Sequence, residues 1–184
     1  MKNLLESFAK DEKGTAALEF VLVFPVFFGF FLMTYEAGII SSRHVMLERG
    51  VDIAVREVRI GVIPDPTRDN LRSRICTVAG ILPDCERQLE IELVQRDPRA
   101  WVALDPEIQC VDRGDLDAVP VDMIDGTANN ELMFMRACIR IDPFLPSSAL
   151  GKAIVAANDN ARADGSYALV ATGAFVVEPF RADP

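Results

Sequence analysis

The sequence has little of what an enzyme or a metalloprotein usually needs. His44 is its single histidine, and none of its 4 cysteines forms a C-x-x-C pair, so the common zinc ligand sets cannot be assembled. A nucleophile elbow, a phosphate-binding loop and a metalloprotease motif are also missing. We therefore predict no enzyme activity, no cofactor and no metal site, and we interpret His44 as a polar residue near a membrane surface.

Positive charge is scarce as well. The 19 lysine and arginine residues are outnumbered by 28 aspartate and glutamate residues, which gives a net charge of −9. Proteins that bind nucleic acid need clustered cations to neutralise phosphates, and the sequence contains no such stripe. We therefore predict that nucleic acid is not a partner.

One long hydrophobic run is present, from Thr15 to Tyr35. As an α-helix it would be roughly 31 Å long, which is enough to cross the hydrocarbon core of a membrane. Pro25 predicts a helix break within it, and Glu36 is expected to lie solvated at the far interface beside the aromatic Tyr35. A cleaved secretory signal is the alternative. It is disfavoured because acidic residues precede the run and no small-residue cleavage site follows it.

A carboxylate lies close to the start of this run, in Gly14-Thr15-Ala16-Ala17-Leu18-Glu19-Phe20. An ionised side chain in a membrane helix is costly, so it is a functional candidate. A short polar leader that ends in glycine, before an apolar helix with glutamate near its start, resembles the processing site of type IV pilins and pseudopilins. The alanine-rich start, the Glu-Phe pair and the following proline are most similar to TadE-like pseudopilins of the tight-adherence (Tad or Flp) pilus system.

The resemblance implies a minor pseudopilin, because the major Flp pilins are far shorter than this chain. A prepilin peptidase would cleave between Gly14 and Thr15, since glycine lacks a side chain that would block the bond. Glu19, with Phe20 beside it, would then neutralise the new amine of Thr15 in its own chain or in a neighbouring subunit and so set the axial register of the subunits. The implied partners are the prepilin peptidase, other pilins and pseudopilins, the inner-membrane pilus assembly platform and inner-membrane lipid.

These features predict a leader at 1–14, a transmembrane helix at 15–40 and a periplasmic α+β domain at 41–184 that includes a helix extension at 41–60. All cysteines follow the apolar run, which predicts an oxidising compartment on that side. We expect a single-pass protein of the bacterial inner membrane with a cytoplasmic N-terminus, and entry into the pilus is left open. The alternatives are a TadF-like, TadG-like or type II secretion pseudopilin, or an uncleaved single-pass protein whose periplasmic domain binds a ligand.

Beyond the membrane segment the pattern predicts an α+β fold, with a long N-terminal helix packed on a small antiparallel sheet as in pilins. The helix is expected from about Ala16 to Arg59, with a bend at Gly50. Its apolar stripe recurs at helical spacing in Leu47, Val51, Ala54, Val55, Val58 and Val62. Further elements are predicted as a helix from Asp65 to about Ala79, period-two strands at 88–93, 133–141 and 167–177, and a helix through Ala157 capped by Ser147 or Ser148.

The four cysteines Cys76, Cys85, Cys110 and Cys138 can pair in three ways. Cys76 and Cys85 flank a short turn and could join the second helix to the first strand. Cys110 would then meet Cys138, on the strand face opposite Ala137, through a covering loop. We expect structural disulfides.

Acidic and amide residues gather in the segment 112–131: Asp112, Asp115, Asp117, Asp122, Asp125, Asn129, Asn130 and Glu131. Their oxygens could bind calcium, but Leu132 stands where an EF-hand needs glutamate. We interpret the segment as a solvated loop, and we expect Trp101 to be a core or interface residue.

Overall fold

The computed structural model describes residues 14–106, 108–113, 124–125, 130–157 and 164–179. Apart from Gly14, the predicted leader lies outside the described residues. The chain forms α2 (Thr15–Arg59), α3 (Arg68–Val78), α4 (Cys85–Gln88), β1 (Leu89–Arg96), β2 (Leu132–Ile141), α5 (Ala149–Ala157) and β3 (Tyr167–Val176).

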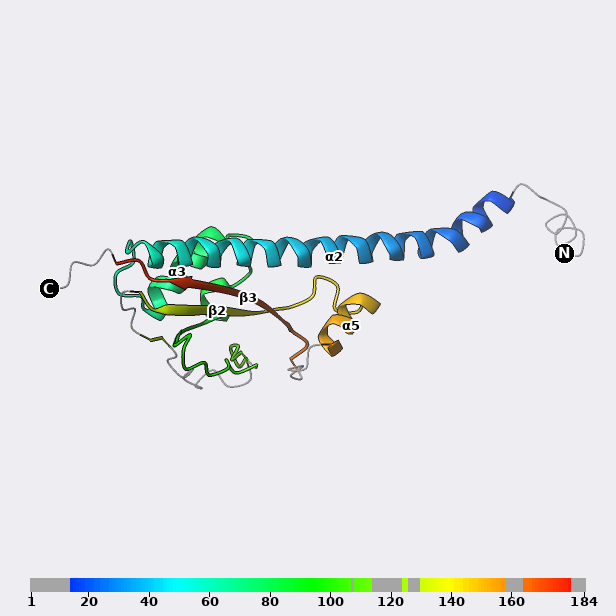
Figure 1. Ribbon diagram of the computed structural model, residues 1–184. Coiled ribbons are helices and arrows are strands. Elements are labelled where there is room, and N and C mark those ends of the chain that lie inside the picture. The colour runs from blue at the N-terminus through cyan, green and yellow to red at the C-terminus, as the bar shows by residue number, and fades with distance from the viewer. Residues whose placement is uncertain (1–13, 107, 114–123, 126–129, 158–163, 180–184) are drawn as a thin grey trace, which may run out of the picture.

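The three strands form one antiparallel sheet in the order β1-β2-β3. The C-terminal half of α2 lies along one face of this sheet, and its N-terminal half extends well beyond the rest of the molecule (Figure 1). The predicted α+β fold, a long N-terminal helix packed on a small antiparallel sheet, is confirmed. We call everything that follows residue 40 the head.

The core lies between α2 and the sheet. The predicted stripe on α2 is buried at Leu47, Val51, Ala54 and Val58, and alternate residues of β2 from Met133 to Ile141 face it. Val62 was expected to continue the stripe. It lies beyond the end of the helix and is exposed, so that part of the prediction is wrong.

Gly50 does not bend α2 as expected but lets another helix approach. A Cβ atom placed on it would lie 3.0 Å from both Cγ2 and the carbonyl oxygen of Ile75 in α3, closer than side chains normally pack. At the sheet, a Cβ atom on Gly173 of β3 would lie 3.0 Å from Cγ2 of Val55. Small residues therefore set how closely α2 packs on both of its neighbours.

The predicted element boundaries needed small corrections. α3 begins at Arg68 rather than Asp65, because the Thr67 side chain caps it by accepting a hydrogen bond from the backbone N–H of Asn70 at 3.3 Å. The one-turn helix α4 was not predicted. Ser148 caps the start of α5 as expected, accepting a 2.8 Å hydrogen bond from the backbone N–H of Gly151.

The second face of the sheet is covered too, which the alternating pattern of β1 did not predict. Glu90 and Glu92 are each only 7% exposed. Arg136 of β2 donates a 2.7 Å hydrogen bond from Nε to Glu92, and Arg72 of α3 donates one of 3.1 Å to Glu90. Buried carboxylates require such partners. The carboxylates on this face of the sheet are therefore paired with arginines and are not solvated.

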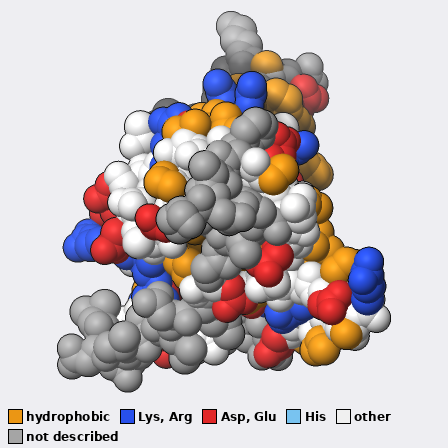
Figure 2. Space-filling view, turned by 60° about the vertical axis from the view of Figure 1, so that its left-hand side comes forward, with side chains coloured by type: hydrophobic (Ala, Val, Ile, Leu, Met, Phe, Trp, Pro, Cys, Tyr) orange, Lys and Arg blue, Asp and Glu red, His pale blue; other side chains and the backbone are white. Residues whose placement is uncertain are grey.

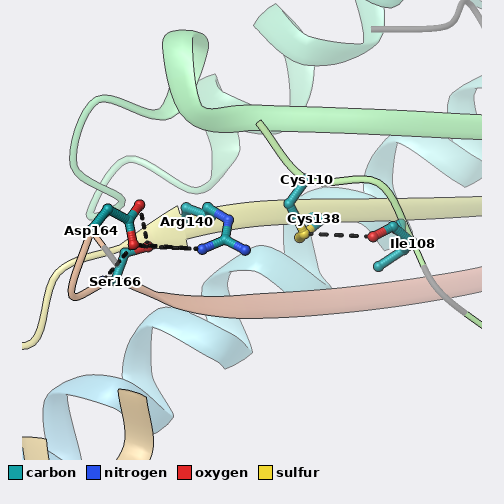
Figure 3. Close-up of a disulfide and its surroundings, with 6 residues drawn as sticks. All are labelled: Ile108, Cys110, Cys138, Arg140, Asp164 and Ser166. Atoms are coloured by element: carbon teal, nitrogen blue, oxygen red, sulfur yellow. Dashed lines mark hydrogen bonds and ion pairs between the residues drawn. A yellow bond between two sulfur atoms is a disulfide. The ribbon is translucent and has the colours of Figure 1, made fainter. Parts of the chain in front are cut away.

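Both expected disulfides are present. Cys76–Cys85 joins α3 to the start of α4, with 5.6 Å between Cα atoms. Cys110–Cys138 ties the covering segment to β2 at 5.3 Å, on the face opposite Ala137 (Figure 3). On the face seen in Figure 2, acidic and basic side chains are interspersed with small apolar patches.

Candidate functional site

The first half of α2, residues 15–35, is an apolar helix whose large side chains are mostly exposed; we call this segment the rod. Its large side chains are 43–68% exposed, among them Leu18, Phe20, Val21, Leu22, Val23, Phe24, Val26, Phe27, Phe28, Phe30 and Phe31. The most apolar window has a mean hydropathy of 2.3, and none of it is buried. By length and composition this one helix could cross a membrane, as predicted.

Phenylalanine rings line one side of this rod. The ring centroids of Phe20 and Phe24 are 4.9 Å apart, those of Phe24 and Phe28 are 5.5 Å apart, and Phe31 follows at 6.4 Å. Spacings of three and four residues place these rings on one helix face. Offset stacking between them adds a modest stabilisation and presents a continuous aromatic surface to whatever covers the helix.

The residues of the predicted processing site lie at the start of α2. Gly14 is the exposed N-cap in right-handed helical conformation, and Thr15 begins the helix. Glu19 is exposed, and within the described residues no hydrogen bond or ion pair occupies its carboxylate. It lies one turn, about 6 Å, along the axis from Thr15. A carboxylate placed there can neutralise a cation at the helix start or on another chain.

Pro25 lies inside an uninterrupted helix, so the predicted break is not present. Instead the axis of α2 bends in its blue N-terminal part, which contains this residue (Figure 1). Proline removes one backbone hydrogen bond and its ring crowds the preceding turn, which bends a helix without ending it when the flanking turns remain intact.

Glu36 is the main departure from expectation, because it is completely buried rather than solvated. The Ser148 hydroxyl donates to its Oε2 at 2.6 Å, and the backbone N–H of Leu145 donates to its Oε1 at 3.2 Å. A Cβ atom on Gly151 would come within 3.3 Å of the same carboxylate and 2.5 Å of the Leu145 carbonyl. Glu36 therefore fastens the start of α5 to α2.

Next to this contact, Tyr35 packs edge-on against Phe144, with 5.5 Å between ring centroids. An open groove of about 490 Å³ lies beside Tyr35, lined also by Gly38, Ile39, Ser42, Arg43 and Ile81. The guanidinium of Arg43, one of the lining residues, donates to the Tyr167 hydroxyl and to the Asp142 carbonyl, each at 3.3 Å. We call Tyr35, Glu36 and their partners at 144–148 the junction.

His44 has a partner that the sequence did not reveal. Its Nε2 lies 3.1 Å from the Val170 carbonyl oxygen of β3 and 3.7 Å from the Glu48 carboxylate. The ring therefore donates to the exposed edge of β3 and helps hold α2 on the sheet. No sequence signal links residues so far apart along the chain.

A second buried polar cluster lies on the covered face of the sheet (Figure 3). Arg140 donates to the Ser166 hydroxyl at 3.1 Å, and that hydroxyl donates to Asp164 at 2.8 Å. Burial alone would raise the pKa of Asp164, but the hydrogen bonds from the backbone N–H and hydroxyl of Ser166, with the charges of Arg140 and Arg113, outweigh it and lower the pKa. The arrangement is that of a structural ion pair.

Most of the acidic loop, including Asp115, Asp117 and Asp122, lies outside the described residues, so the calcium alternative stays untested. Among the residues that are described, no three acidic, cysteine or histidine side chains come together as a metal site would need. Asp125 instead accepts a 2.8 Å hydrogen bond from the backbone N–H of Gln95. Trp101 is 55% exposed and packs edge-on against Phe134 at 5.8 Å, so it is a surface residue of the head.

The fold and the junction define a protein with one long N-terminal helix, apolar and uncovered in its first half, that carries a disulfide-linked α+β head. Residues 14–56 match the model of the TadE-like protein family, which confirms the family resemblance of the sequence over nearly all of α2. No curated protein and no solved structure gives a match.

Proposed function

We propose that the protein is a minor pseudopilin of a tight-adherence type pilus, which is processed by a prepilin peptidase after Gly14 and takes part in assembling or initiating the fibre. It acts mechanically, as a template, and catalyses no reaction. Its partners are the peptidase, other pilins and pseudopilins, and the inner-membrane assembly platform. The TadE-like match at residues 14–56 supports a role related to the Tad pilus.

The observation that carries this proposal is the exposed carboxylate of Glu19, unpartnered among the described residues, on an uncovered apolar helix. The side chain is exposed and has no partner among the described residues, yet a charge in hydrocarbon is costly unless it is paired. The amine that cleavage would create on Thr15 is the partner the arrangement calls for, in the same chain or in a neighbouring subunit. Pairing between subunits would fix their stagger along the fibre.

The proposed topology is a single crossing of the inner membrane, with the head in the periplasm. The two disulfides of the head support this orientation, because disulfides persist in oxidising compartments and are rare in the cytosol. Lipid then covers the exposed first half of α2 until other subunits replace it.

The test is the intact mass of the membrane-extracted protein, made with and without a prepilin peptidase. We expect a chain that starts at Thr15 only when the peptidase is present. Gly14→Leu should abolish this product, whereas Gly29→Leu, a matched glycine with nothing within 4 Å, should leave it intact. A chain that starts at Met1 under every condition would overturn the proposal and favour an uncleaved, tethered binding domain.

The phenotype of a deletion separates the members of the class. Loss of pili that is restored by the wild-type chain supports the tight-adherence role. Loss of protein secretion with normal pili would instead indicate a type II secretion pseudopilin.

A further inference from the structure

The junction places one face of the head, formed by Phe144 and α5, at the position along α2 where the apolar rod ends. Tyr35 ends that rod, and its ring packs on Phe144. Phe144 is itself 54% exposed. Figure 1 shows α5 beyond the end of the sheet, on the side of the N-terminal half of α2. If the rod crosses a bilayer, which the proposed function requires, this face lies at the bilayer surface.

The junction also fixes that placement. The buried carboxylate of Glu36 accepts hydrogen bonds from the Ser148 hydroxyl and the Leu145 backbone N–H. These two residues stand at the two ends of the turn that leads into α5. Because Gly151 leaves no room for a side chain against Glu36 and Leu145, α5 cannot move far without breaking buried hydrogen bonds. The segment is therefore positioned rigidly relative to the rod.

The side chains on this face suit a lipid interface. The outward positions of 144–157 include Phe144, Pro146, Ala153, Ala156 and Ala157. The only charged side chain of α5 is Lys152, which is exposed. α5 has no acidic residue in a chain of net charge −9. An exposed aromatic ring at the end of a membrane-length helix, followed by a lysine, is compatible with contact at a bilayer surface, where the lysine stem can lie along apolar surface and its amine can reach the headgroups.

We propose that Phe144 and α5 form a second, interfacial membrane contact, with the Phe144 ring at the boundary between headgroups and acyl chains and Lys152 at the level of the phosphates. The head then lies against the bilayer surface in one fixed orientation. Glu36 is the positioning residue that sets this orientation. The contact must be given up when the protein leaves the bilayer, so it favours the membrane-resident state.

The test uses single-tryptophan forms of the full chain in vesicles of zwitterionic and anionic phospholipids that carry bromine either shallow or deep in the acyl chain. The natural Trp101 is the head control. Trp101 packs on Phe134, which pairs with Ala174 of β3. The neighbouring residue Gly173 lies against Val55, which is 20 residues, or about 30 Å, along α2 from Tyr35. Phe144→Trp and Phe28→Trp, each combined with Trp101→Phe, report on the proposed contact and on the rod.

We expect the indole at position 144 to lose more fluorescence with shallow bromines than with deep ones. The indole at position 28 should be quenched in the bilayer, and Trp101 should respond only to aqueous acrylamide. Ala153→Trp, at an exposed site of α5, repeats the measurement without changing the Tyr35 contact and should also be quenched by shallow bromines.

Two results would overturn the inference and differ in what they mean for the protein. In the first result, brominated lipid quenches position 28 but only acrylamide quenches positions 144 and 153. The membrane span is then supported and the interfacial contact is refuted. In the second result, only acrylamide quenches every position. This would refute the membrane span as well, and with it the proposed function.

Discussion

The first half of α2 is much more apolar than the second, and the two halves have opposite surroundings. In the second half, Leu47, Val51, Ala54 and Val58 are at most 2% exposed against the sheet and α3. In the first half, every large apolar side chain from Leu18 to Phe31 is at least 43% exposed. One continuous helix therefore joins a core element to an element that this chain leaves uncovered.

The difference shows that the distribution of apolar residues around a helix indicates what the helix packs against. The second half has a stripe of apolar residues with polar residues between them, which is typical of a helix with one buried face. The first half is apolar on every side, as expected for a helix surrounded by lipid or by other helices. The junction at Glu36 is the point where one environment replaces the other.

The sharpest test of this comparison makes the same substitution in each half. Leu47→Ala removes a fully buried side chain and should lower the free energy of unfolding of the head by about 2–5 kcal/mol. Leu22→Ala, at 67% exposure, should change it by less than about 0.5 kcal/mol. Denaturant unfolding of the full chain in detergent measures both, and equal effects would refute the division of the helix.

Removing the disulfides should weaken the head without affecting the rod. The Cys110–Cys138 bridge spans 28 residues and Cys76–Cys85 spans 9, so chain entropy predicts losses of about 3–4 and about 2–3 kcal/mol respectively. The matched variants Cys110→Ser with Cys138→Ser, and Cys76→Ser with Cys85→Ser, test this by denaturant unfolding. A larger loss from the shorter bridge would contradict the entropic account.

At the boundary between the halves, Glu36→Ala should lower the stability of the head by about 1–3 kcal/mol, because the Ser148 hydroxyl and Leu145 N–H lose a buried acceptor. Glu36→Gln keeps an acceptor and should cost less. Glu48→Ala, an exposed site on the same helix, serves as the control. If the Glu36 and Glu48 variants unfold alike, the junction does not fasten α5.

The smallest effect is a pH dependence confined to the head. The pKa of Asp164 is lower in the folded protein than the value of about 3.9 in an unfolded chain. Its contribution to stability is therefore fully present above about pH 4 and is lost as the pH falls through the folded pKa. Asp164→Asn should flatten the decline of the unfolding midpoint below pH 4, compared with the exposed-site control Asp52→Asn. An unchanged slope would exclude this carboxylate as a source of acid sensitivity.

Much of the fold followed from local pattern. The period of the apolar residues located α2 and all three strands, since a buried stripe or an alternating face leaves a clear signature in sequence. The sequence left three cysteine pairings open; the short turn between Cys76 and Cys85 and the strand face of Cys138 only favoured the pairing that the structure has. The segment from Gly14 to Phe20 predicts a processing site because a carboxylate in an apolar run has few structural explanations, and cleavage there stays a prediction.

The largest failures involve contacts between distant residues. Glu36 looked like a solvated helix end because Ser148, its partner, lies 112 positions away. Glu90 and Glu92 looked solvent-facing because the arginines that pair with them lie on other elements. A sequence shows a polar residue, but it does not show which distant group will neutralise it.

The central claim is that the uncovered half of α2 pairs with other subunits through Glu19. The most direct measurement is zero-length carbodiimide cross-linking in membranes that also contain the peptidase, followed by mass spectrometry of the products. The account predicts an amide between the Glu19 carboxylate and the N-terminal amine of a processed pilin-type chain, between subunits, and its loss in Glu19→Gln. Processed protein that yields no Glu19 adduct in assembled fibres or membranes would contradict it.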